Sequence, residues 1–247
     1  MQPLLKIDHL VGGYTNKNVL HDVSFHVKKA EIVGLIGLNG AGKSTTIKHI
    51  IGLMQAKKGT IEINGQTFKQ EPTAYRKQIA YIPEQPILYE ELTLFEHLRL
   101  TAMAYDIDEK IFERRLPLLL KAFRMERQLH WFPVHFSKGM RQKVMIMCAF
   151  LIEPALYIVD EPFVGLDPLG IQSYLELMND MKEKGAGVLM STHILATAER
   201  YCDRFIILHE GEIRSQGTLT ELQEEFQMPK ASLDELYIQL TKEESNV

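Results

Sequence analysis

A glycine-rich segment places the strongest constraint on how this chain folds. Residues 37–45 read GLNGAGKST and match the pattern G-x-x-x-x-G-K-[S/T]. A short apolar run at residues 31–36 precedes them, and a helical pattern at residues 45–53 follows. Glycines let backbone N–H groups turn toward phosphate oxygens, and the start of the following helix adds a positive dipole. The pattern therefore predicts a buried strand, a phosphate-binding loop and a helix in direct succession.

This loop predicts where a nucleoside triphosphate binds. Lys43 is expected to reach the outer phosphates and so to take part in catalysis, and the Ser44 hydroxyl is expected to be a ligand of Mg²⁺. The predicted nucleotide-binding residues of the loop are Gly37, Asn39, Gly40, Ala41, Gly42, Lys43, Ser44 and Thr45. Many functions share such a loop, so it does not define the activity by itself.

A second apolar run ends in two acidic residues. Residues 156–159 predict a buried strand, and Asp160 and Glu161 follow it directly. Triphosphate hydrolysis needs a metal anchor and a group that activates water. Asp160 is predicted to hold Mg²⁺ through water, and Glu161 to polarise the attacking water.

Strand and helix patterns alternate at both ends of the chain, with a helical block between them. The predicted strands are residues 4–10, 19–27, 31–36, 60–63, 79–82, 156–159, 188–191 and 205–208. The predicted helices are residues 45–53, 140–152, 168–184 and 196–201, with helical stripes through Leu94, Leu98 and Met103, through Ile111, Leu116, Leu119 and Phe123, and through Leu233, Leu236, Tyr237 and Leu240. Pro117 is expected to kink the second stripe or to begin it. This order predicts an α/β fold with a mostly parallel sheet and a helical insertion.

Composition narrows the class of protein. The chain has 247 residues, of which 45% are hydrophobic, and a formal net charge of −4. A mildly acidic chain argues against a dedicated nucleic-acid binder. Cys148 and Cys202 lack metal-ligand spacing, which argues against zinc and favours a reduced cytoplasmic protein. The N-terminus lacks a signal-peptide pattern, and the longest apolar run, residues 144–152, is far shorter than the roughly 20 residues of a membrane span.

Five further segments resemble motifs of the ATPase subunits of ABC transporters, and the resemblance extends from about residue 4 to about residue 222. It implies that Tyr14 stacks on adenine and that the Gln85 amide contacts Mg²⁺ or water. Residues 136–142, FSKGMRQ, resemble the signature segment, although Lys138 and Met140 depart from its usual Leu-Ser-Gly-Gly-Gln form. Ser137 and Gly139 would cover the γ-phosphate of ATP bound to a second subunit, and Asp167 would lie in the loop along the subunit junction. His193 would donate to the γ-phosphate.

The resemblance implies a fold and an assembly. The fold is that of a P-loop NTPase forming a single ABC ATPase domain over residues 1–247, with a RecA-like core at about 1–85 and 155–222, an antiparallel N-terminal β portion, a helical subdomain at about 86–154 and a helical tail at about 223–247. The expected cofactors are ATP and Mg²⁺. The expected partners are a separate transmembrane subunit and a second ATPase subunit at the cytoplasmic face of the membrane, without nucleic acid. A homodimer is favoured, and a pair of non-identical ATPase subunits stays open. Residues 34–40 and the compact length resemble the Ecs-type exporter ATPases of Gram-positive bacteria.

The membrane partner is expected to contact the helical block. Apolar residues after Gln85 offer a surface there, although some of them belong to the core. They are Leu88, Tyr89, Leu92, Leu94 and Phe95.

Two other classes of protein remain as alternatives. A soluble ABC ATPase that acts on nucleic acid or ribosomes would usually carry a long inserted coiled coil or a second ATPase domain, and the interval between Lys43 and Ser137 has no room for the former. A P-loop kinase or GTPase would lack the Ser137 segment, and a GTPase would normally carry an Asn-Lys-x-Asp base reader, which is not found. The cargo cannot be identified from these residues, because its contacts lie on the partner.

Overall fold

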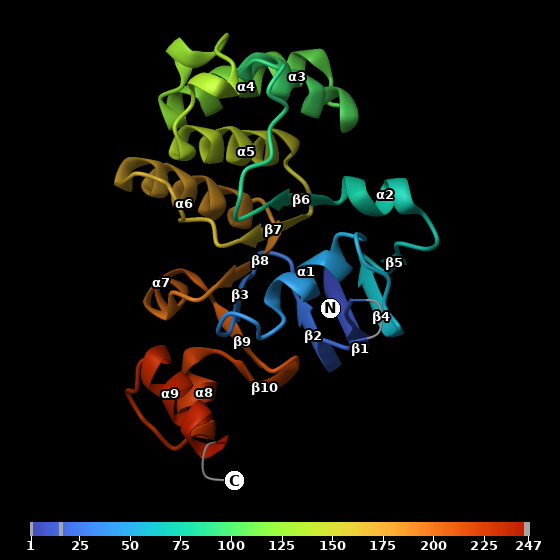
Figure 1. Ribbon diagram of the computed structural model, residues 1–247, viewed down its shortest axis with the longest axis vertical. Helices are drawn as coiled ribbons and strands as arrows, with labels where there is room; N and C mark the ends of the chain where they lie inside the picture. Colours follow the sequence, from blue (N-terminus) through green and yellow to red (C-terminus); the bar gives the residue numbers. More distant parts are fainter. Residues whose placement is uncertain (1, 15–16, 245–247) are drawn as a thin grey trace.

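A six-stranded sheet forms the centre of the molecule (Figure 1). The structure, a computed structural model, describes residues 2–14 and 17–244. The strand order is β10-β9-β3-β8-β7-β6, in which β9, β3, β8, β7 and β6 are parallel and β10 is antiparallel to β9. The strands are β3 (Ile32–Ile36), β6 (Ile79–Ile82), β7 (Leu156–Asp160), β8 (Gly187–Thr192), β9 (Arg204–His209) and β10 (Glu212–Gly217). Neighbours that are distant in sequence require helical crossovers, as expected for an α/β fold.

A smaller antiparallel sheet is built mainly from the N-terminal part of the chain. Its order is β2-β1-β4-β5, with β1 (Leu5–Gly12), β2 (Leu20–Val27), β4 (Lys58–Ile63) and β5 (Gln66–Thr67). Asn64 and Gly65 join β4 to β5, with φ angles of 48° and 75°. Two successive positive φ angles match the right-handed twist of a hairpin, and Asn-Gly adopts them readily. The predicted antiparallel β portion is confirmed.

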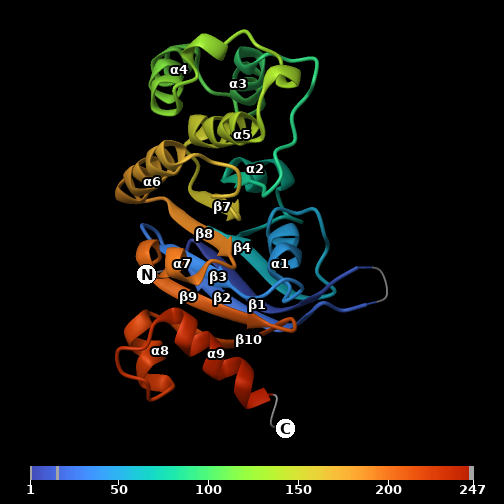
Figure 2. The same ribbon diagram turned by 60° about the vertical axis from the view of Figure 1, so that its left-hand side comes forward.

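Helices lie at both ends of the molecule and beside the large sheet. They are α1 (Lys43–Ile50), α2 (Pro72–Lys77), α3 (Leu94–Ala104), α4 (Glu109–Phe123), α5 (Lys138–Ile152), α6 (Pro168–Glu183), α7 (Leu195–Tyr201), α8 (Leu219–Glu225) and α9 (Leu233–Glu244), with 3-10 turns at Glu126–Gln128 and Pro133–His135. In both views α3, α4 and α5 are grouped at one end, and α8 and α9 are grouped at the other (Figures 1 and 2). The predicted helical insertion is the group α3 to α5.

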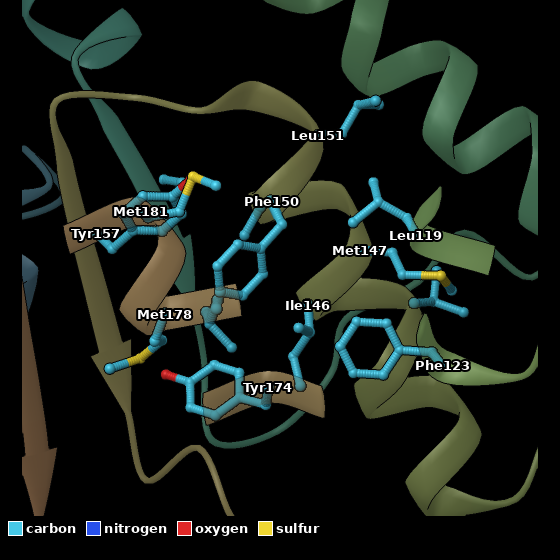
Figure 3. Packing of buried hydrophobic residues seen from close by; sticks show 14 of the residues in the cluster. Leu119, Phe123, Ile146, Met147, Phe150, Leu151, Tyr157, Tyr174, Met178 and Met181 are labelled. Carbon is cyan, nitrogen blue, oxygen red and sulfur yellow. The ribbon is translucent and has the colours of Figure 1, made fainter. Parts of the chain in front are cut away.

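The large sheet separates two hydrophobic clusters. Along β7, Tyr157 and Val159 belong to the cluster that contains α5, whereas Leu156 and Ile158 belong to the cluster that contains α1 and the small sheet. Successive side chains of a strand point to opposite faces, so α5 and α1 cover opposite faces of this sheet. On the α5 face, the ring of Phe150 lies 5.1 Å from that of Tyr157 (Figure 3).

A third cluster lies under α9. The four apolar residues predicted as a stripe of the tail, Leu233, Leu236, Tyr237 and Leu240, are all buried there. They pack with α7, α8, β9 and Ile36 of β3. The predicted amphipathic helix of the tail is therefore confirmed, and it packs beside the end of β3. Residues 245–247 of the predicted tail lie outside the described residues.

Some sequence predictions are wrong. Met103 is 69% exposed, while Leu94, Leu98 and Ala102 are buried. Residues four apart in a helix, such as Leu94, Leu98 and Ala102, lie on the same face. Met103 follows Leu98 by five residues and therefore points away from that face. Leu94 is core and cannot offer a free docking surface. Pro117 lies inside α4, so it does not begin that helix.

The sequence did not predict three short elements, α2, β10 and α8. Each has only six or seven residues, and β10 is half-exposed at the edge of the sheet. Short elements with few buried side chains leave a weak periodic signal, which is why the pattern did not indicate them.

Candidate nucleotide-binding site

The glycine-rich loop joins β3 to α1, as predicted. Gly40 and Gly42 have φ angles of 88° and 112°, in the left-handed region that side chains disfavour. At Gly37 a Cβ atom would lie 2.4 Å from the carbonyl oxygen of Leu208 in β9. The loop conformation thus requires glycine at these three positions. Asn39 is exposed on the loop and Ser44 at the start of α1, whereas Ala41 and Thr45 are buried.

The Lys43 side chain folds back over its own loop. It is buried, and its Nζ donates to the carbonyl oxygens of Gly37 at 2.7 Å and Leu38 at 3.3 Å. Burial lowers the pKa of Lys43, while the negative charges of Glu161, Asp160 and Glu84 act to raise it. The ammonium group therefore lies in the field of the acidic residues at the ends of β6 and β7.

The two acidic residues after β7 have separate partners on β8. Asp160 is paired in register with Ser191, whose hydroxyl donates to Asp160 Oδ1. The Thr192 hydroxyl donates to Glu161 Oε2 at 3.3 Å, and His193 Nδ1 lies 2.7 Å from Glu161 Oε1. Both carboxylates are buried. The parallel register of β7 and β8 thus brings Asp160, Glu161 and His193 together.

Glu161 has an unusual backbone conformation. Its φ angle is 49°, in the left-handed region, while its N–H donates to Ser191 O at 3.1 Å. Such a conformation costs on the order of 1–3 kcal/mol in a residue other than glycine. Ten other described residues besides glycine also have a positive φ, so this conformation shapes the turn after β7 and does not by itself assign a role to Glu161.

Tyr14 lies beside α1. Its hydroxyl accepts a hydrogen bond from Lys48 Nζ at 3.0 Å, and that nitrogen lies 5.4 Å from the ring centroid. The hydrogen bond from Lys48 lowers the pKa of Tyr14. The ring is 53% exposed, so a flat partner has access to it. Gln85 is exposed on the loop after β6.

The signature-like segment begins α5. Ser137 is the N-cap residue, and its Oγ accepts from the Met140 N–H at 3.2 Å. A Cβ atom at Gly139 would lie 2.5 Å from the carbonyl oxygen of Gly165, so only glycine lets α5 approach the loop before α6 this closely. Asp167 lies in that same loop. The segment is thus packed against the predicted subunit-junction loop and lies on the opposite sheet face from α1.

Asp167 fixes the loop before α6. It is the N-cap of α6 and accepts from the Gly170 N–H at 2.5 Å, and Lys143 Nζ donates to it at 2.8 Å. The hydrogen bond from Lys143, followed by that from Gly170, lowers the pKa of Asp167. The contact ties α5 to the start of α6.

Comparison with known proteins decides the family. The sequence profile described as "ABC transporter" matches residues 20–164. The chain belongs to the ABC transporter family. It is 67% identical over 242 residues to the ABC-type transporter ATP-binding protein EcsA of Bacillus subtilis, covering 98% of each chain, and 46% identical over 234 residues to YthP of the same organism, covering 94% of each. A solved structure described as the ATP-binding subunit of an ABC transporter is 64% identical, with a TM-score of 0.95, and the match covers 96% of this chain and 99% of that one.

The comparisons confirm the P-loop NTPase fold and the similarity to Ecs-type ATPases that the sequence predicted. ABC ATP-binding proteins are ATPases coupled to transport, so this ABC chain binds ATP and is an ATPase. Within the described parts of the chain, no helix is both long and apolar enough to pass through a bilayer.

Several contacts of this ABC site were not predicted. Ser191 and Thr192 hold the two carboxylates, and Lys48 holds Tyr14. Ser191 and Thr192 directly precede His193 at the end of a buried strand. Two hydroxyl residues at the end of an apolar run are the sequence feature that could have indicated these contacts. Lys48 and Tyr14 are far apart in sequence, so no local pattern could indicate their contact.

Proposed function

We propose that this chain is the ATP-hydrolysing subunit of an ABC exporter, that two copies of it pair head to tail around two ATP molecules, and that the pair drives a separate transmembrane subunit from the cytoplasmic face. One observation carries this proposal. Ser137 begins α5 on one face of the large sheet, while the phosphate loop opens α1 on the other. A second copy is then the natural source of the Ser137 segment for each nucleotide. The exporter direction is supported by the Ser-Lys-Gly-Met form of that segment.

The phosphate loop grips the triphosphate in this proposal. Backbone N–H groups of residues 40–45 and the start of α1 bind phosphate oxygens, Lys43 binds the outer phosphates, and Tyr14 stacks on adenine. The groups assigned to Mg²⁺ are Ser44, Asp160 and Gln85, all oxygen donors, which suits this ion. Mg²⁺ in nucleotide sites usually keeps several waters and is bound through one or two carboxylates and the substrate phosphates, which fits this set of groups. Mg²⁺ would neutralise charge that develops on the phosphates.

Glu161 and His193 carry out the chemistry that we propose. A water molecule attacks the γ-phosphorus as the bond to the bridging oxygen of ADP breaks, and Glu161 polarises that water and takes its proton. His193 contacts Glu161 at 2.7 Å and is placed to donate to the γ-phosphate. Loss of the γ-phosphate removes the anion that both subunits bind, so the pair opens.

The proposed contact with the transmembrane subunit is an exposed apolar surface on two neighbouring loops. Ile87 is 79% exposed, Tyr89 63% and Val134 70%, and Trp131 and Phe132 are also exposed. This surface, formed by Ile87, Tyr89, Trp131, Phe132 and Val134, lies within the proposed helical subdomain of residues 86–154. Exposed apolar patches of this kind mark protein contacts.

Side chains at the start of α5 hold the two loops together. Arg141 donates to both Glu90 carboxylate oxygens, at 2.7 and 3.1 Å, and to Pro133 O at 3.0 Å. The next residue, Gln142, donates to Pro83 O at 3.3 Å, just before Gln85. A partner that moves this surface would therefore move the Gln85 loop and the Ser137 segment as well. This linkage supports the surface as the point where ATP binding is coupled to transport.

An association experiment tests the shared site. Glu161→Gln protein is mixed with ATP and Mg²⁺, and its mass is measured by light scattering after size exclusion. We expect a dimer with ATP and a monomer without it, and Ser137→Arg in the same background should stay monomeric. Thr93→Arg, at the N-cap of α3, is the matched control and should still dimerise. A dimer that survives Ser137→Arg would contradict the shared site.

A co-purification experiment tests the membrane partner. The chain is expressed with the product of its neighbouring gene, if that product has several apolar spans, and the pair is isolated in detergent. Ile87→Glu with Tyr89→Ala should abolish co-purification and leave ATP binding intact. Met103→Glu, another exposed apolar position, should not affect it. Loss of the partner with Met103→Glu alone would contradict the assigned surface.

A further inference from the structure

The C-terminal helix contacts the phosphate loop directly. The hydroxyl of Tyr237 in α9 accepts a hydrogen bond from the N–H of Leu38 at 3.1 Å. Leu38 is the second residue of the glycine-rich segment, and Tyr237 lies almost 200 residues further along the chain. In both views α9 is at the end of the molecule away from α3 to α5 (Figures 1 and 2). The tail is therefore part of the surroundings of the nucleotide site.

Packing fixes the Tyr237 ring in place. The side chain is 6% exposed and belongs to the cluster that includes Ile36, the residue directly before Gly37. Leu233, Leu236 and Leu240 of the same helix are also buried in this cluster. A ring held by close packing has few rotamers open to it, so its hydroxyl presents a fixed acceptor to the loop.

The other side of the same residue is held by Lys43. The Leu38 carbonyl accepts from Lys43 Nζ at 3.3 Å and from the Ala41 N–H at 3.1 Å. Leu38 thus has its N–H bonded to α9 and its carbonyl bonded to the phosphate-binding lysine, while its side chain is 57% exposed. Because the Leu38 side chain packs against little else, the hydrogen bonds of its backbone N–H and carbonyl fix the position of this residue in the loop.

A second contact ties α9 to the helix after His193. Glu199 of α7 accepts from the Leu233 N–H at 2.7 Å, at the first turn of α9. α7 begins at Leu195, two residues after His193. α9 therefore bridges the segments that follow β3 and β8, which carry Lys43 and His193.

We propose that Tyr237 is a positioning residue of the phosphate loop. Its hydroxyl acts through the Leu38 peptide to hold the loop in the conformation that receives the phosphates, so the C-terminal helix sets nucleotide affinity. The inference rests on the proposed nucleotide site. Tyr237 touches neither phosphate nor water in this role, so its loss should weaken binding and leave the chemical step nearly unchanged.

The test compares Tyr237→Phe with Tyr105→Phe. The Tyr105 hydroxyl also makes a partly buried 3.1 Å hydrogen bond to the backbone, to Ile79 O, away from the loop. Binding of ATP and of ADP with Mg²⁺ is measured by calorimetry, and turnover at saturating ATP is measured separately. Tyr237→Phe should weaken both dissociation constants by about threefold to tenfold, the effect of one lost hydrogen bond, with kcat within about twofold. Tyr105→Phe should leave the dissociation constants unchanged.

Hydrogen exchange gives a readout that packing alone would not change. The Leu38 amide should be protected in the nucleotide-free wild type and should exchange faster in Tyr237→Phe but not in Tyr105→Phe. An unprotected Leu38 amide in the wild type overturns the inference even if the variant does not fold. Equal nucleotide affinities for Tyr237→Phe and wild type would also overturn it. Failure of the wild type to bind ATP would instead overturn the proposed function.

Discussion

The Nδ1 atom of His193 lies 2.7 Å from the Oε1 atom of Glu161. The two residues follow β8 and β7, which are parallel neighbours, and β3 lies on the other side of β8. The carboxyl ends of parallel strands meet at one edge of a sheet, where α/β proteins bind ligands. Lys43 after β3, His193 after β8 and Glu161 after β7 therefore face one site.

Glu161→Gln should retain ATP affinity and lower turnover by at least about 100-fold, because an amide cannot take a proton from water. Steady-state hydrolysis and calorimetric ATP binding measure the two effects. Glu210→Gln is the matched control, since Glu210 also has a left-handed backbone, with a φ angle of 46°, directly after a strand of the same sheet. Undiminished hydrolysis by Glu161→Gln would remove this residue from the chemistry.

His193→Ala should lower turnover by about 100-fold and change ATP affinity only a few-fold, because the ring positions the reacting groups. The side chain is 48% exposed, so thermal stability should stay close to that of the wild type. His9→Ala is the control, because His9 Nδ1 also lies close to a carboxylate, 2.6 Å from Asp22 Oδ1. This variant should leave turnover unchanged. Equal turnover in His193→Ala and His9→Ala would contradict the role assigned to His193.

Lys43→Ala should weaken ATP and ADP binding by about 10-fold to 100-fold, the value of one or two charge-assisted hydrogen bonds. The variant should still fold, because alanine has a high helix propensity and Lys43 is the first residue of α1. Burial also disfavours the charge of Lys43, as its lowered pKa indicates, so removing the charge should cost little stability. Lys182→Ala, which breaks the ion pair to Asp203, serves as the control. Wild-type affinity in Lys43→Ala would contradict the phosphate-loop assignment.

Asp167→Asn keeps an N-cap side chain for α6 but loses the charge beside Lys143. The pKa of Asp167 is lowered from its ordinary value of 3.8, so its contribution is present above that value and is lost as the pH falls through the lowered pKa. Half of this carboxylate is exposed, so the variant should be less stable by under about 1 kcal/mol at pH 7.

Urea unfolding between pH 7 and pH 3.5 measures this difference. The gap between wild type and Asp167→Asn should be constant at neutral pH and should begin to narrow as the pH falls below about 3.8, the ordinary pKa of this carboxyl. Asp108→Asn, at the N-cap of α4, controls for the effect of changing a cap. A gap that widens as the pH falls would reverse the sign and contradict the assigned contact.

The sequence predicted most of the strands because their signals are local. Buried strands such as β3 and β7 are short apolar runs that end in Gly37 and in Asp160, and these endings mark where the chain leaves the sheet. β10 was missed because an edge strand with alternating exposure looks like a polar loop. Met103 was misplaced because a spacing of five residues resembles helical periodicity without keeping to one face.

Sequence by itself predicted the candidate chemistry of this ABC ATPase from the glycines that allow the loop, Lys43, the two acidic residues and the histidine. These signals are local in the sequence, and taken together their residue types suit triphosphate hydrolysis. Only the tertiary structure decided which groups meet. The 2.7 Å contact of His193 with Glu161, the Lys143–Asp167 pair and the bond from Leu38 to Tyr237 each join distant parts of the chain. Strand order, register and helix packing set these distances, and no local pattern encodes them.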